Sequence, residues 1–120
     1  DGLHPKLVQL YGMLSRAMAE LGKPIRITEG CRSMERQAQL YAQGRTAPGK
    51  VVTNAKPGQS RHNFCAAFDV VFTKTGYDGP ASDWDILGML GKSFQKELGV
   101  TIVWGGDWRG FPDRPHFEIP

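Results

Sequence analysis

The chain has 120 residues, 40% hydrophobic and 22% charged, which is typical of one globular domain and excludes an intrinsically disordered composition. Its net charge of +3 comes from scattered lysines and arginines without a basic block, so we expect no binding to nucleic acid. No apolar run reaches about eighteen residues, so we expect no membrane insertion. We therefore expect a single domain over residues 1–120, acting as a monomer.

The first elements are a helix and a short strand. Apolar residues at three- and four-residue spacings predict a helix over about residues 3–21, which Gly22 and Pro24 end. The stretch PIRITEG then alternates isoleucines with polar residues and predicts a half-buried strand that stops at Gly30.

A second helix and a long loop follow. The stretch SMERQAQLYAQGRT predicts a helix with Ser33 as its N-cap and Gly44 near its C-terminus. We expect its buried side to carry Met34, Ala38 and Tyr41. Residues 47–60 are rich in Gly, Pro, Asn and Ser and predict a long surface loop, and loops of this length are usually functional or disordered.

The second half of the chain predicts a strand over residues 66–72, a helix over residues 82–98, a strand in VTIVW and a last strand in HFEI. We expect Ser82 to be the N-cap of that helix. Its apolar side is formed by Trp84, Leu87, Leu90, Phe94 and Leu98. This order of elements predicts an α+β fold, with a small antiparallel sheet packed against about three helices.

One carboxylate stands in an apolar strand. Alternation puts Phe68 and Val70 on one face of the strand, and Asp69 on the other face beside the small Ala67. A carboxylate in such a strand is costly unless it is paired or binds a metal. We therefore expect Asp69 to face a cleft on the second side of the sheet.

The chain has three histidines, and two of them follow loops and begin elements near Asp69. His62 and His116 together with Asp69 form a three-ligand set that Zn²⁺ accepts, with a fourth position open for water. Asp113, three residues before His116, is the candidate general base for hydrolysis by a metal-activated water. We expect His4, at the start of the first helix, to be exposed and not a ligand.

The two cysteines, Cys31 and Cys65, lack the spacing of a zinc or redox motif. We expect two buried free thiols. A single disulfide is the alternative if the protein works in an oxidising compartment.

Two stretches carry a resemblance to a known family. SRHNFCAAFDV fits the pattern SxHxxGxAxD, and WGGDWRGFPDRPHFE fits WGGDWxxFxDxPHFE. Both patterns are those of the zinc L-alanyl-D-glutamate peptidases of phage endolysins, within a wider group that includes D-alanyl-D-alanine carboxypeptidases and hedgehog-type proteins. The resemblance covers about residues 28–119.

The resemblance implies a role for particular residues. The family's zinc ligands match His62, Asp69 and His116, for one zinc ion per chain, and its catalytic acid matches Asp113. Arg32 matches an arginine that binds a substrate carboxylate or the oxyanion. Two further residues belong to this set, Ser60 as a residue that orients the metal ligands and Trp108 as a wall of the substrate cleft. Glu118 shares the face of His116 and either supports the site or is a surface carboxylate.

One position departs from the family pattern. Cys65 stands where the pattern has glycine, so we expect it either to adopt an ordinary β conformation or to fill the gap with a small side chain. Pairing with Cys31 is a further alternative.

The resemblance also implies a function. We expect hydrolysis of the peptidoglycan stem peptide at the L-alanyl-D-glutamate bond, as in phage lysis. The alternatives are a D-alanyl-D-alanine carboxypeptidase and a non-catalytic zinc-binding or wall-binding module. The carboxypeptidases have a glutamate and an ExWH motif where this chain has Asp113 and DRPH, which favours the endopeptidase.

The expected place of action is the cell wall, in the periplasm or outside the cell. No signal peptide is recognisable in this chain. Export is therefore expected through a holin, a phage tail, a secretion system or a leader that has been removed.

Overall fold

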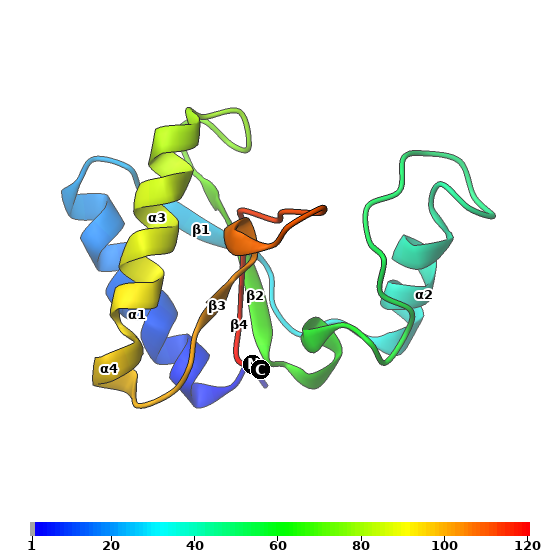
Figure 1. Ribbon diagram of the computed structural model, residues 1–120, viewed down its shortest axis with the longest axis horizontal. Helices are drawn as coiled ribbons and strands as arrows, with labels where there is room; N and C mark the ends of the chain where they lie inside the picture. The colour runs from blue at the N-terminus through cyan, green and yellow to red at the C-terminus, as the bar shows by residue number, and fades with distance from the viewer. Residues whose placement is uncertain (1) are drawn as a thin grey trace.

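A computed structural model describes residues 2–120 (Figure 1). Its elements in chain order are α1 (Pro5–Glu20), β1 (Ile25–Glu29), α2 (Met34–Ala42), the 3-10 helix η1 (Arg61–Phe64), β2 (Ala67–Phe72), α3 (Ala81–Ser93), α4 (Gln95–Leu98), β3 (Val103–Trp104), the 3-10 helix η2 (Gly105–Asp107) and β4 (His116–Glu118). The four strands form one antiparallel sheet in the order β1-β2-β4-β3. The expected α+β class, with a small antiparallel sheet and about three longer helices, is confirmed. No helix among residues 2–120 is both long and apolar enough to cross a membrane.

The main core lies between the sheet and the helices α1 and α3, which cover the same face (Figure 1). The periodic apolar residues of α1 are fully buried there, namely Leu7, Leu10, Leu14 and Met18. From the sheet, the alternate residues Phe68, Val70 and Phe72 of β2 enter the same core. The predicted alternation of β2 is therefore confirmed, and Asp69 points to the other face of the sheet.

Helix α2 lies on that other side, away from α1 and α3 (Figure 1). The expectation for its buried side is wrong, because Met34 is 49% exposed, Ala38 is exposed and Tyr41 is only half-buried. The fully buried residue is Gln37, whose amide donates to the carbonyl of Ala55 at 2.7 Å. The inner side of α2 meets the backbone of the 43–60 loop, so a hydrogen-bonding side chain replaces an apolar one there.

The helix expected over residues 82–98 is divided into α3 and α4. It begins after Pro80, which forms no side-chain cap, so the expectation that Ser82 is the N-cap is wrong. The interruption follows from side-chain competition for carbonyls. Ser93 Oγ donates to the Leu90 carbonyl at 2.6 Å, and Gln95 Nε2 donates to the Lys92 carbonyl at 2.9 Å.

Cys31 and Cys65 form a disulfide, so the expectation of free thiols is wrong. The bond joins the segment that follows β1 to the end of η1. Cys65 has φ 55°, in the left-handed region, which explains why the family pattern has glycine here and shows that the expected β conformation is wrong. The alternative of a single bridge is confirmed. Local patterns could not decide for it, because they give no distance between residues so far apart in the sequence.

The loss of this disulfide should destabilise the fold. The bond closes a loop with a sequence separation of 34 residues, for which chain entropy predicts a contribution of roughly 3–4 kcal/mol. We expect Cys31→Ser/Cys65→Ser to lower the free energy of unfolding by about that amount in urea titrations. Equal stability of the oxidised wild type and the variant would contradict this account.

A second prediction concerns the close approach of α3 to the sheet. A Cβ at Gly88 would collide with the ring of Trp104, which is buried and held by a hydrogen bond from its Nε1 to the Arg114 carbonyl at 2.8 Å. Gly88→Ala should therefore destabilise the protein by about 1–3 kcal/mol, although alanine is the better helix former. In the control Gly12→Ala in α1, a Cβ meets nothing within 4 Å, so up to about 1 kcal/mol of stabilisation is expected. Thermal unfolding of both variants measures the difference, and a stabilised Gly88→Ala protein would be the contrary result.

Candidate metal centre and cleft

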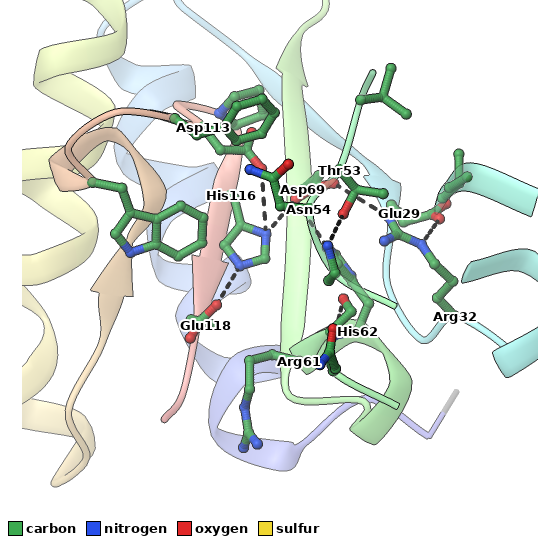
Figure 2. A pocket seen from close by; sticks show the side chains of 18 of the residues that line it. Glu29, Arg32, Thr53, Asn54, Arg61, His62, Asp69, Asp113, His116 and Glu118 are labelled. Atoms are coloured by element: carbon green, nitrogen blue, oxygen red, sulfur yellow. Dashed lines mark hydrogen bonds and ion pairs between the residues drawn. The ribbon is translucent and has the colours of Figure 1, made fainter. Parts of the chain in front are cut away.

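Three side chains that could together hold a metal ion come from separate parts of the chain and meet on the second face of the sheet (Figure 2). Asp69 in β2 and His116 in β4 are directly opposite one another in the antiparallel register, and His62 reaches them from η1. Asp69 Oδ1 lies 3.0 Å from His116 Nδ1 and 3.3 Å from His62 Nε2. One donor atom of each side chain lies within 4.8 Å of the others. Among residues 2–120 this is the one group of three that could hold a metal ion.

The position of His62 is fixed by its local structure. Ser60 caps η1, since its Oγ accepts from the backbone N–H of His62 at 3.2 Å. The ring Nδ1 lies 2.7 Å from the carbonyl of Gly30, which can only accept, so Nδ1 carries the hydrogen and donates it. Nε2 is therefore the ring nitrogen that faces Asp69 and is available to a metal ion.

Asp113 lies next to this cluster. Its Oδ2 is 3.9 Å from His116 Nδ1, and its side chain is 38% exposed toward the cleft. The turn is held by the Asp113 N–H, which donates to the Gly105 carbonyl at 2.8 Å. A Cβ at position 105 would collide with the Asp113 carbonyl, so Gly105 is required for this approach. Asp113 is thus placed beside the donors without being one of the three.

Arg32 is held at the edge of the cluster by polar neighbours. Its Nε donates to Glu29 Oε1 at 2.7 Å and its Nη1 donates to Gln37 Oε1 at 2.9 Å. These two bonds fix the plane of the guanidinium, and its Nη2 lies 4.0 Å from Asp69 Oδ2. Glu29 is itself the register partner of Asp69 on β1, so the three strands β1, β2 and β4 present a row of polar side chains.

The cluster forms the floor of a cleft of about 830 Å³. One wall is formed by α2 and the loop residues 52–55, and the other by the segment that contains Trp108, Phe111 and Pro115. The Trp108 ring lies 5.0 Å from the His116 ring, centre to centre, and is partly exposed. Trp108 therefore lines the cleft beside the cluster, and its contact with a substrate stays a prediction.

Electrostatic interactions shift the pKa values of three groups. Burial raises the pKa of Asp69, but hydrogen bonds and positive charge from His116 and His62 outweigh this effect and hold the pKa far below its usual value. Burial, with a smaller effect of the Asp69 charge, raises the pKa of Asp113. Burial lowers the pKa of His116, but hydrogen bonds with Asp69 and Glu118 outweigh it and raise the pKa to about 9.

These residues fit a zinc ion. Two imidazole nitrogens and one carboxylate oxygen are the donor types of catalytic zinc sites, and an ionised Asp69 is ready to act as a ligand without losing a proton. Three carboxylates, from Asp69, Asp113 and Glu118, lie against the two imidazoles, and Arg32 is the cation in contact with Asp69. A divalent cation reduces this excess of negative charge.

The third histidine, His4, has a structural role at the start of α1. His4 lies at the N-terminus of α1, is exposed, and its Nδ1 accepts from the backbone N–H of Lys6 at 3.0 Å. It serves as the helix cap and lies outside the cluster.

Sequence reasoning missed several contributors to the site. Gln37 orients Arg32, but a glutamine on a short amphipathic helix gives no signal that distinguishes it from a surface residue. The carbonyl of Gly30 contributes through its backbone and has no sequence signal. Of the two alternatives for Glu118, its position favours support of the site over a surface carboxylate, because its Oε1 lies 2.7 Å from His116 Nε2.

Comparison with known proteins relates this chain to carboxypeptidases and to a peptidoglycan endopeptidase. Two family models, both described as D-alanyl-D-alanine carboxypeptidase, match residues 53–119 and 1–84. The chain is 39% identical over 128 residues to the peptidoglycan L-alanyl-D-glutamate endopeptidase CwlK of Bacillus subtilis, covering 98% of this chain and 73% of that protein.

Two solved structures share the fold. The L-Ala D-Glu endopeptidase ChiX of Serratia marcescens has 28% identity and a TM-score of 0.76, with 99% of this chain and 81% of that chain covered. A vancomycin resistance D,D-pentapeptidase VanY in complex with Zn(II) has a TM-score of 0.69 over 98% of this chain and 72% of that chain, and at 14% identity it supports the fold alone. The chain belongs to the D-alanyl-D-alanine carboxypeptidase family of zinc peptidases, which includes peptidoglycan endopeptidases and carboxypeptidases.

Proposed function

We propose that this protein is a zinc peptidase that hydrolyses the stem peptide of peptidoglycan at the L-alanyl-D-glutamate bond. The observation that carries the proposal is the convergence of His62, Asp69 and His116 on the floor of an open cleft, with Asp113 beside them. A structural zinc site has four protein ligands, whereas three ligands leave a position for chemistry.

The roles of the residues follow from their placement. His62 Nε2, Asp69 Oδ1 and His116 Nδ1 would hold one zinc ion. When bound, the ion supplies a nucleophilic water at neutral pH and polarises the scissile carbonyl. Asp113 accepts the proton of the attacking water and returns it to the amine that leaves, and its raised pKa suits both steps.

Substrate binding is assigned to the walls and edge of the cleft. Arg32 has a guanidinium plane fixed by Glu29 and Gln37, so it binds a substrate carboxylate or the developing oxyanion without reorganising. Ser60 contributes through the backbone of His62, and the Trp108 ring provides an apolar contact for the peptide.

The choice of bond rests on the relatives. CwlK, at 39% identity, and ChiX, at 28%, are both described as L-alanyl-D-glutamate endopeptidases. The second candidate is hydrolysis of a terminal D-alanyl-D-alanine bond, which the description of both family models favours. The aspartate at position 113 supports the endopeptidase, because the carboxypeptidase pattern has a glutamate there.

The proposal also covers the partner of this protein and its place of action. The partner is the peptidoglycan stem peptide, and the place of action is the cell wall, outside the cell or in the periplasm. The motif resemblance extends this to phage lysis. The Bacillus subtilis relative is a bacterial protein and supports only the cell-wall chemistry.

The proposal is tested by incubating purified peptidoglycan with protein that has been stripped of metal and then reloaded with zinc. Mass spectrometry of the released fragments should show new N-terminal D-glutamate after reloading and none after stripping. Release of free D-alanine would instead support the carboxypeptidase. A zinc-loaded protein that releases nothing would leave the non-catalytic module as the answer.

Replacing the proposed base should abolish turnover without removing the metal. Because Asp113 is beside the ligands and is not one of them, Asp113→Asn should lower kcat by about 10²–10⁴-fold while zinc affinity stays within a few-fold. Fragment release and zinc titration measure the two quantities. Asp107→Asn, in a surface pair with Lys92, is the control and should retain activity. Full activity of Asp113→Asn would remove Asp113 from the mechanism.

Zinc affinity should depend on pH. The raised pKa of about 9 means that His116 in the metal-free protein carries a proton at neutral pH, which zinc must displace. Apparent affinity should therefore rise about tenfold per pH unit between about pH 7 and 8, and level off as the pH passes the pKa. Competition with a chromophoric chelator measures it, and an affinity independent of pH in this window would be the contrary result.

A further inference from the structure

Glu118 contacts Nε2 of His116, the ring nitrogen that faces away from the cluster. His116 Nδ1 faces Asp69 Oδ1 at 3.0 Å, and its Nε2 lies 2.7 Å from Glu118 Oε1 (Figure 2). The Glu118 side chain is only 15% exposed. The ring is thus held from both sides by two carboxylates. Asp69 belongs to the cluster, and Glu118 lies outside it.

The place of Glu118 in the sheet makes this contact rigid. It stands two residues after His116 on β4, so the two side chains share a face. Strand β4 is an inner strand, and Glu118 pairs with Ala67 on one side and with Val103 on the other. An inner strand with a partner on each side restricts movement of Glu118 relative to His116.

The two histidines of the cluster use opposite nitrogens. His62 faces the cluster with Nε2 and donates from Nδ1 to the Gly30 carbonyl. His116 faces the cluster with Nδ1, so it needs an acceptor at Nε2, and Glu118 is the acceptor found there. Each ring therefore has one nitrogen at the cluster and an acceptor at the other.

We propose that Glu118 is a positioning residue, which accepts the hydrogen that His116 keeps on Nε2 when Nδ1 binds the zinc ion, and so holds the ring with Nδ1 toward Asp69 and His62. This inference rests on the proposed function, because it assigns Glu118 to the same zinc site. The physical reason is that both ring nitrogens of His116 face a carboxylate, which can only accept a hydrogen bond. A zinc ion would replace the hydrogen on Nδ1, with Asp69 as a fellow ligand, and the remaining hydrogen on Nε2 would be held by Glu118. Acceptors of this kind fix the ring orientation of metal-binding histidines.

Two variants separate hydrogen bonding from simple charge. Glu118→Ala removes the acceptor, whereas Glu118→Gln keeps an amide oxygen that accepts from Nε2 but removes the charge. Asp107→Ala is the matched control, because it removes a carboxylate that pairs with Lys92 on the surface and lies outside the cluster. Folding of each variant is checked by circular dichroism and thermal unfolding.

The first measurement is the zinc dissociation constant at one pH, by chelator competition. We expect Glu118→Ala to bind zinc about 10–100-fold more weakly, Glu118→Gln to recover most of the loss, and Asp107→Ala to match the wild type. Zinc affinity unchanged in Glu118→Ala, or lost equally in Glu118→Gln, would overturn the proposed role.

The second measurement is the tautomer itself, from long-range ¹H–¹⁵N correlation spectra of the histidine rings in the zinc-loaded protein. The wild type should show His116 with its hydrogen on Nε2, and this readout also stands if Glu118→Ala fails to fold. A hydrogen on Nδ1 in the wild type would overturn the proposal. A wild type that binds no zinc would instead refute the proposed function, so the two failures are distinguishable.

Discussion

The antiparallel register between β2 and β4 is the constraint on which the site depends, because it sets Asp69 directly opposite His116. A buried carboxylate is unfavourable alone, and here it is compensated by two imidazoles and the nearby guanidinium of Arg32. A shift of one residue in this register would turn Asp69 or His116 into the core that α1 and α3 cover. The apolar residues on the core face of β2 therefore fix the polar residues on its other face.

The third side chain of the candidate metal centre depends on a different part of the chain. His62 is brought to the sheet by η1, which the Cys31–Cys65 disulfide joins to the segment after β1. That segment supplies both the Gly30 carbonyl for His62 and the guanidinium of Arg32. The backbone N–H of Arg32 also donates to the His62 carbonyl at 2.9 Å. One covalent link and one backbone bond thus connect the edge of the cleft that carries Arg32 with His62 of the candidate metal centre.

Local patterns were sufficient for the main elements and insufficient for their pairing. The periodicity of α1 and the alternation of β2 predict which residues enter the core, because both follow from the geometry of a single element. The motif residues identify the family and the members of the cluster. The buried Gln37 and the break between α3 and α4 could not be predicted, because they depend on contacts between distant segments or on side chains that compete for backbone carbonyls. The Cys31–Cys65 disulfide is predicted only as an alternative to free thiols, because no local pattern gives the distance between the two residues.

The central claim is that three side chains and no more form the protein part of the metal centre, with Asp113 beside it. X-ray absorption spectroscopy of the zinc-loaded protein tests this most directly, since it reports the type and distance of the atoms around the metal. The account predicts two imidazole nitrogens at about 2.0–2.1 Å and oxygen ligands at about 2.0–2.2 Å, with the same spectrum in Asp113→Asn. A sulfur ligand at about 2.3 Å, or a zinc environment that changes when Asp113 is replaced, would contradict it.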